Sequence, residues 1–256
     1  MSDPYSQDRQ GTSLSPDAHI ARDLARNLAD VHEKIARAAL AAGRRPEDIR
    51  LIAVSKTKPL AMIRAAFAVG QRIFGENYVQ EALAKVDACM NAEVEWHFIG
   101  GLQTNKVKAI TGRFALIHSV DRVRLTDELE KAAAKAGVIQ DILLQVHVGG
   151  EESKSGVSMD EAPALIERIA GHSHLCLRGL MSLPPLTEDE RVGRGFFASL
   201  REALERWRRL LPADQAARFN ELSMGTSSDY EWAILEGATY VRVGTAIFGA
   251  RSRQRS

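Results

Sequence analysis

The feature that most constrains the fold of this chain is a regular alternation of strand-like and helix-like segments. Eight short runs rich in β-forming apolar residues occur along the sequence, and each is followed by helix-capable sequence. The runs begin at Leu51 and continue at residues 72–75, 94–100, 114–120, 141–148, 175–183, 219–224 and 240–243. Repeated strand–helix units with short connections favour parallel strands, and eight units fill a chain of 256 residues. We therefore predict an α/β fold, a closed (β/α)8 TIM barrel.

The segments outside the eight units are expected to be peripheral. An alanine-rich amphipathic segment at residues 17–42 ends before Gly43, so we expect an extra helix ahead of the first strand. Residues 1–17 are polar and lack the apolar region of a signal peptide, and we interpret them as a flexible arm. We assign residues 18–251 to the barrel and residues 252–256 to a short basic tail.

Composition excludes several classes of protein. The formal net charge is +1 with acids and bases interspersed, so we expect neither nucleic-acid nor membrane-surface binding. No apolar run is long enough to cross a bilayer. Cys89 and Cys176 lie far apart and have no disulfide or metal-ligand spacing. We therefore expect reduced thiols, a cytoplasmic protein and no metal site.

Functional side chains of such a barrel gather at the carboxyl ends of its strands, and the first strand ends on Lys56. By position alone a solvated lysine is the simpler interpretation. Two turns favour a site instead: MGTSSD at residues 224–229 and VRVGT at residues 241–245 follow the last two runs. Their small residues and free backbone amides are typical of phosphate-binding turns, although ordinary turns with a helix cap at Ser228 are the alternative.

Closure of the barrel would bring the first strand beside the eighth, and hence Lys56 beside these turns. A lysine next to an anion site suits a phosphorylated aldehyde. Imine formation needs a neutral amine, and burial together with a cation such as Arg242 would lower the lysine pKa from about 10.4. Single histidines in strands are more often core groups than acids or bases. We place His97 at the border of the pocket and interpret His118 as structural.

Seven motifs then occur in order: AVSKTKP at 53–59, FGENYVQE at 74–81, WHFIG with LQTNK at 96–106, SKSG at 153–156, LRGLM at 177–181, LSMG at 222–225 and VRVGTAIFG at 241–249. Through these motifs the chain resembles the pyridoxal phosphate homeostasis proteins, single-domain relatives of the alanine racemase barrel. The resemblance covers the chain from about residue 18 to residue 251. It implies an alanine racemase N-terminal type of TIM barrel.

The resemblance also implies a cofactor and its ligands. Lys56 would form the internal aldimine with pyridoxal 5′-phosphate. The phosphate would be surrounded by Ser227, Gly244 and Thr245, and the pyridine nitrogen would face Arg242. Asn77 and His97 would line the ring or its approach. The implied function is to hold this cofactor and supply it in vitamin B6 homeostasis, with apo-enzymes that depend on it as partners.

Two interpretations of the activity remain open. An arginine against the pyridine nitrogen disfavours its protonation and weakens the ring as an electron sink. The racemase relatives add a second domain and a tyrosine from a partner subunit, whereas five residues follow Arg251 here. Lys56 alone could act as a base on one face of an amino acid's α-carbon but not on both. We therefore expect a monomeric binding protein without a catalytic residue; the alternative is an amino-acid racemase of narrow substrate range.

Overall fold

Eight parallel strands pair in sequence order and close into a barrel, because β1 pairs with both β2 and β8. The computed structural model describes residues 16–89, 93–149 and 155–250. The strands are β1 (Arg50–Val54), β2 (Ile73–Glu76), β3 (Glu95–Phe98), β4 (Leu116–Val120), β5 (Gln140–Gln145), β6 (Leu175–Met181), β7 (Glu221–Ser223) and β8 (Tyr240–Val243). The predicted barrel is confirmed.

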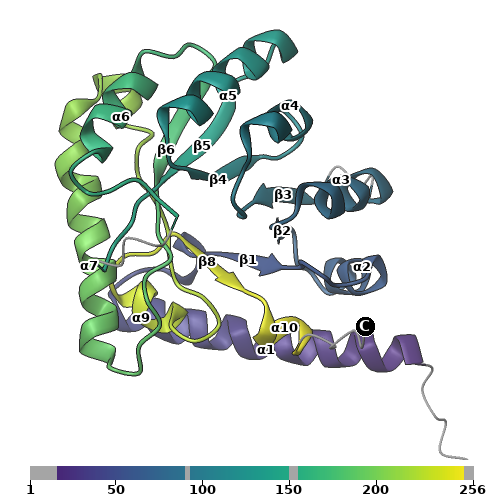
Figure 1. The fold of residues 1–256 in the computed structure, drawn as a ribbon. Helices are drawn as coiled ribbons and strands as arrows, with labels where there is room; N and C mark the ends of the chain where they lie inside the picture. Colours follow the sequence, from purple (N-terminus) through teal and green to yellow (C-terminus); the bar gives the residue numbers. More distant parts are fainter. Residues whose placement is uncertain (1–15, 90–92, 150–154, 251–256) are drawn as a thin grey trace, which may run out of the picture.

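Helices surround the strands on the outside (Figure 1). The α-helices are α1 (Pro16–Ala41), α2 (Leu60–Ala68), α3 (Val79–Ala88), α4 (Val107–Ile110), α5 (Val123–Ala136), α6 (Ala162–Ala170), α7 (Glu190–Trp207), α8 (Ala213–Ala216), α9 (Tyr230–Leu235) and α10 (Thr245–Phe248). Short 3₁₀ helices are η1 (Pro46–Asp48), η2 (Thr104–Lys106) and η3 (Arg208–Leu210). The sequence predicted neither α8 nor α10, since four residues are too few to show helical periodicity.

The apolar core has two parts, because alternate residues of a barrel strand face inwards and outwards. The larger part lies between the strands and the helices. The smaller part lies inside the barrel and consists of Ile52, Leu116, Leu143, Met181 and Tyr240. The inside also contains buried polar side chains, among them His97, His118 and Arg242.

The extra helix α1 packs across α9, α10 and α2, as the lower part of Figure 1 shows. Its face is fixed by hydrogen bonds as well as by apolar contacts. Asn27 Nδ2 donates to the carbonyl of Ile247 at 2.9 Å, and Arg44 NH1, three residues beyond the end of α1, donates to that of Ala238 at 2.7 Å. Helix α1 therefore holds the elements that follow β7 and β8.

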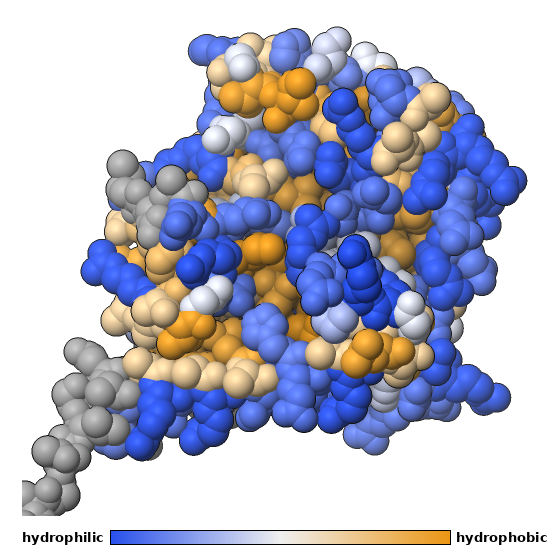
Figure 2. Space-filling model, turned by 180° about the vertical axis from the view of Figure 1, so that it is seen from behind, coloured by the Kyte–Doolittle hydropathy of each residue, from blue (hydrophilic) through white to orange (hydrophobic). Residues whose placement is uncertain are grey.

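The two ends of the chain lie largely outside the described residues. Most of the predicted arm, residues 1–15, and the tail at 252–256 lie outside the described residues, whereas residues 16 and 17 belong to α1. Figure 2 shows one face that is mostly hydrophilic, with apolar residues in small groups and a hollow near its centre. Among the described helices, none is long and apolar enough to span a membrane.

Candidate functional site

A cleft opens at the carboxyl ends of the strands and consists of two adjoining hollows of about 500 and 570 Å³. Both are lined by Asn77, Ile99, Leu183, Leu186 and Thr226. The first also contains Lys56, and we call the two together the Lys56 cleft. All the predicted cofactor residues except His97 line this first hollow, from loops that follow β1, β2 and β7 and from β8 and its end.

Lys56 lies on a tight turn directly after β1. Lys58 N donates to the Ser55 carbonyl at 3.0 Å, which closes the turn. Thr57 has a φ of 63°, the one positive φ among the described non-glycine residues. A hydrogen bond from the fourth residue to the first, with positive φ at the third, is the pattern of a type II turn, where glycine is usual. A β-branched threonine in this conformation is strained by about 1–3 kcal/mol.

A buried ionic network holds the turn in that conformation. Lys85 Nζ donates to the Ser55 carbonyl at 2.7 Å and to Glu76 Oε1 at 2.7 Å, and it reaches Glu81 Oε1 at 2.6 Å. Glu81 Oε1 also accepts from Thr57 N at 2.5 Å, and Ser55 Oγ donates to Glu76 Oε1 at 2.6 Å. The residues on both sides of Lys56 are thus bonded to α3 and to the end of β2.

This network was not predicted from the sequence. Burial raises the pKa of Glu76, while the hydrogen bonds from Lys85 and Ser55 act in the opposite direction. A detectable signal was present: Glu81 and Lys85 stand four residues apart on one helix face, next to an acid at a strand end. What the sequence could not show is that this face turns toward β1.

The two lysines of AVSKTKP have different surroundings. Lys58 Nζ donates to the carbonyls of Phe248, Gly249 and Ala250 at 3.0, 3.0 and 3.1 Å. It therefore ties the turn to the end of α10, whereas Lys56 lines the cleft. This contrast makes Lys58 a natural control for Lys56.

The turns after β7 and β8 approach each other at the same end of the cleft. Gly244 N donates to Ser227 Oγ at 3.2 Å, and Thr226 N donates to Asp229 Oδ1 at 2.6 Å. Gly225 has a φ of +87°, and a Cβ there would lie 2.6 Å from Ala233 Cβ. The expected alternative of a helix cap at Ser228 is not what the structure has, because the N-cap residue of α9 is Asp229 and forms no side-chain cap.

Arg242 is buried at the floor of the cleft, with 4% of its surface exposed. NH1 donates to Ser223 Oγ at 2.6 Å, and NH2 donates to the Ser182 carbonyl at 2.8 Å. Burial lowers the pKa of Arg242 to about 10, so the guanidinium remains charged at neutral pH. Asn77 Oδ1, on the lining of the cleft, is buried without a hydrogen-bond partner. An orphaned polar atom and a buried cation fit a polar ring bound in the cleft.

His97 lies away from the cleft surface. It is fully buried inside the barrel and lines neither hollow. Its ring nitrogens lie 2.6 Å from Glu95 Oε1 and 2.9 Å from His118 Nε2. A role along the cofactor ring, as the sequence predicted, stays a prediction for His97; the contacts seen here are with barrel side chains.

Comparisons with known proteins agree with this geometry. The family model described as alanine racemase, N-terminal domain, matches residues 27–252. A pyridoxal phosphate homeostasis protein of Pseudomonas aeruginosa is 45% identical over 228 residues, covering 89% of this chain and 96% of that protein. One from Aquifex aeolicus is 43% identical over 224 residues, covering 88% and 96%. The chain belongs to the family of pyridoxal phosphate homeostasis proteins.

Solved structures extend the comparison. PipY of Synechococcus elongatus, solved with PLP bound, matches with a TM-score of 0.78 at 36% identity, covering 88% of this chain and 100% of that one. Alanine racemase of Corynebacterium glutamicum matches with a TM-score of 0.66 at 17% identity, covering 92% of this chain and 63% of that one. The latter likeness concerns the fold alone.

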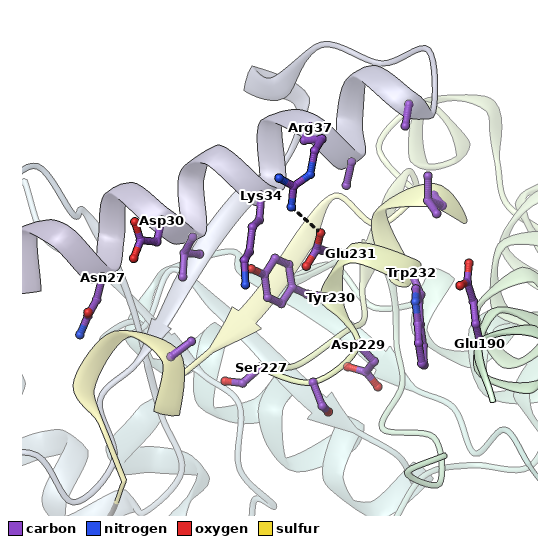
Figure 3. Close-up of a pocket in the computed structure, with 16 residues that line it drawn as sticks. Asn27, Asp30, Lys34, Arg37, Glu190, Ser227, Asp229, Tyr230, Glu231 and Trp232 are labelled. Carbon is purple, nitrogen blue, oxygen red and sulfur yellow. Dashed lines mark hydrogen bonds and ion pairs between the residues drawn. The ribbon is translucent and has the colours of Figure 1, made fainter. Parts of the chain in front are cut away.

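A third hollow of about 640 Å³ lies between α1 and α9, and it shares Ser227, Ser228 and Asp229 with the Lys56 cleft. Figure 3 shows Lys34 pointing toward Tyr230, and Arg37 paired with Glu231 across the hollow at 3.3 Å. Acids and bases both line it, so its charge favours no class of ligand. In the described ranges no group of three or more potential metal ligands occurs.

Proposed function

We propose that this protein binds pyridoxal 5′-phosphate covalently through Lys56 and holds it for supply to enzymes that need it. When bound, this cofactor supplies an aldehyde that condenses reversibly with a neutral amine. Membership of the pyridoxal phosphate homeostasis proteins supports the function, and PipY with PLP bound supports the cofactor. We further propose that it acts as a monomer in the cytoplasm and delivers the cofactor to apo-enzymes.

The observation that carries this proposal is the convergence of the predicted ligands in one cleft. Lys56, Asn77, Ser227 and Arg242 are far apart in the sequence and line the same hollow. We propose that Ser227, Gly244 and Thr245 hold the phosphate, that Arg242 donates to the pyridine nitrogen, and that Asn77 contacts the ring edge.

Binding without turnover is supported by the acids and bases of the cleft. Among the described residues that line it, the titratable side chains are Lys56, Arg242 and Asp229. Arg242 stays protonated at neutral pH, and Asp229 Oδ1 accepts hydrogen bonds from both Thr226 N and Thr226 Oγ1. A racemase needs a base on each face of the α-carbon, and Lys56 can serve as one. We propose that it serves as a tether.

The decisive experiment is borohydride reduction of the purified protein with pyridoxal phosphate, followed by peptide mass mapping. We expect one adduct at Lys56 in the wild type and none there in Lys56→Ala. Lys58→Ala is the matched control, since Lys58 binds backbone carbonyls, and its adduct at Lys56 should persist. A wild-type protein without a lysine-linked cofactor would reject the proposal.

The racemase alternative is tested on the same loaded sample. Hydrogen–deuterium exchange at the α-carbon is followed over a panel of amino acids, and release of cofactor to an apo-enzyme is measured in parallel. We expect release and only slow exchange. Sustained exchange at enzymic rates for one amino acid would instead establish racemization.

A further inference from the structure

A continuous hydrogen-bond chain crosses the inside of the barrel and ends on Arg242. It starts at Glu95, the first residue of β3, whose Oε1 lies 2.6 Å from His97 Nε2. His97 Nδ1 lies 2.9 Å from His118 Nε2, and His118 Nδ1 lies 2.9 Å from Ser223 Oγ. Arg242 NH1 then donates to Ser223 Oγ at 2.6 Å. The chain links the amino end of β3 with the floor of the Lys56 cleft.

Between its two ends, the hydrogen-bond chain is closed to solvent. His97, His118 and Ser223 are fully buried, whereas the side chain of Glu95 is 44% exposed. A buried polar group without a partner is costly, and each of the three buried groups here is bonded on both sides. The barrel therefore contains a satisfied polar network where an apolar core would have been the simpler solution.

With one proton on each ring, the two ends of the chain determine the direction of every bond. A guanidinium has donors only, so Ser223 Oγ accepts from Arg242 and turns its own proton to His118 Nδ1. His118 then donates from Nε2 to His97 Nδ1, and His97 donates from Nε2 to the carboxylate. A carboxylate only accepts, so the Glu95 end requires the same direction. Each ring thus carries its single proton on Nε2.

The electrostatic surroundings agree with neutral rings. Burial lowers the pKa of His97, although the Glu95 carboxylate acts to raise it. Burial also lowers the pKa of His118 well below its ordinary value. The other charged or ionisable groups that face the two rings, from β1, β7 and β8, are Arg50, Glu221, Arg242 and Tyr240.

We propose that Glu95, His97, His118 and Ser223 form a one-directional chain that positions Arg242 as a fixed donor toward the cofactor. The inference rests on the proposed function, because it assigns Arg242 to the pyridine nitrogen. Since Ser223 accepts from NH1 and the Ser182 carbonyl accepts from NH2, the guanidinium plane is held while its other N–H groups remain for the cleft. A guanidinium held in this way would offer a charged donor to the pyridine nitrogen and so disfavour protonation of that nitrogen.

The direction of the chain is tested first, on the wild-type protein without cofactor. Long-range ¹⁵N NMR of the histidine rings distinguishes a proton on Nδ1 from one on Nε2, and His118→Gln assigns the signals. We expect both rings to be neutral and protonated on Nε2 near neutral pH. A proton on Nδ1 of either ring, or an imidazolium, overturns the proposed chain.

The positioning role is tested by two variants of His118. His118→Leu breaks the chain, whereas His118→Gln keeps its direction, because the amide oxygen can accept from Ser223 and the amide nitrogen can donate to His97. We expect cofactor affinity to fall about tenfold in the leucine variant, as for a lost hydrogen bond to a charged group. The pH profile of the bound cofactor's absorbance should shift as well, and the glutamine variant should restore both.

Two results overturn the positioning role: unchanged affinity and absorbance profile in a folded His118→Leu protein, or equal losses in both variants. Glu95→Leu, at the half-exposed end, is the second variant if His118→Leu does not fold, with Glu95→Gln as its control. We expect Glu95→Leu to lower the cofactor affinity and shift the absorbance profile, and Glu95→Gln to restore both. The proposed function fails separately, through the absence of a Lys56 adduct in the wild type, which leaves the NMR result untouched.

Discussion

Thr57 shows how a single residue adapts the barrel to its site. Strand β1 delivers the chain to the cleft, and the turn at Thr57 reverses it so that Lys56 lines the first hollow while Lys58 reaches the end of α10. A left-handed conformation is unfavourable for a β-branched residue by about 1–2 kcal/mol relative to glycine. The hydrogen bond from Thr57 N to Glu81 offsets part of this strain.

Replacement of Thr57 by glycine should relieve the strain. Thr57→Gly is expected to raise the unfolding free energy by up to about 1 kcal/mol, because the gain in the turn exceeds the added flexibility of the unfolded chain. Denaturant unfolding of the apo-protein measures the change. Thr57→Ala keeps the backbone strain and is the control; a glycine variant less stable than the alanine variant would show that the turn is unstrained.

Helix α3 supports the Lys56 turn although none of its residues lines the Lys56 cleft. Its Lys85 reaches below the Lys56 turn and joins the carbonyl of Ser55 to the carboxylates of Glu76 and Glu81. Removal of one member of a buried ion pair leaves the other uncompensated. The helix is therefore a support for the turn as well as a part of the outer layer.

Lys85→Met should weaken both the fold and the site. We expect a loss of about 3 kcal/mol in unfolding free energy, the lower end for a broken buried pair, and at least about tenfold weaker cofactor binding by the folded protein. Lys131→Met on α5 is the matched control, because Lys131 is 71% exposed, and it should change stability by less than about 0.5 kcal/mol. Unchanged cofactor binding by folded Lys85→Met would show that the ionic network has no role in the site.

At the scale of the whole molecule, the barrel interior divides into an apolar cluster and a polar chain. The apolar cluster includes Ile52, Leu143 and Met181, while His97 and His118 occupy neighbouring inward positions. Neutral histidines sealed inside a fold make its stability depend on pH, because the unfolded chain takes up protons that the folded one does not. This pH dependence of stability is therefore a property of the barrel interior and not of the cleft.

The unfolding free energy should therefore fall as the pH drops below about 6.5, the ordinary histidine pKa. The folded pKa of His118 is lowered, so its contribution is fully present above that pH and is lost below it. For one such histidine the slope approaches about 1.4 kcal/mol per pH unit.

Comparison of unfolding at several pH values tests this. His118→Gln should reduce the slope by about this amount, whereas Leu40→Ala, at an exposed position on α1, should keep the wild-type slope. Equal slopes in His118→Gln and the wild type would mean that His118 is charged inside the barrel.

Much of the fold and of the cleft followed from local patterns. Ser158 Oγ accepts from Glu161 N, as a serine does ahead of a helix, and donates to Glu161 Oε2, while α6 starts at Ala162. Strand β8 was predicted to the residue, since a short apolar run between a glycine and a glycine leaves little choice. Boundaries differed where apolar residues continue past a strand, as at Ile99 beyond β3.

The sequence by itself determined the barrel, the order of its strands and the residues that gather at their carboxyl ends, because strand and helix periodicity are local properties and parallel closure leaves one arrangement. The tertiary structure decided which of those residues share a hollow and which turn inward. His97 lies below the cleft, bonded to His118 and Glu95, and Lys85 lies beneath Lys56. Those contacts depend on strand register and helix rotation, which are set by packing across the whole barrel and leave no periodic signal in the chain.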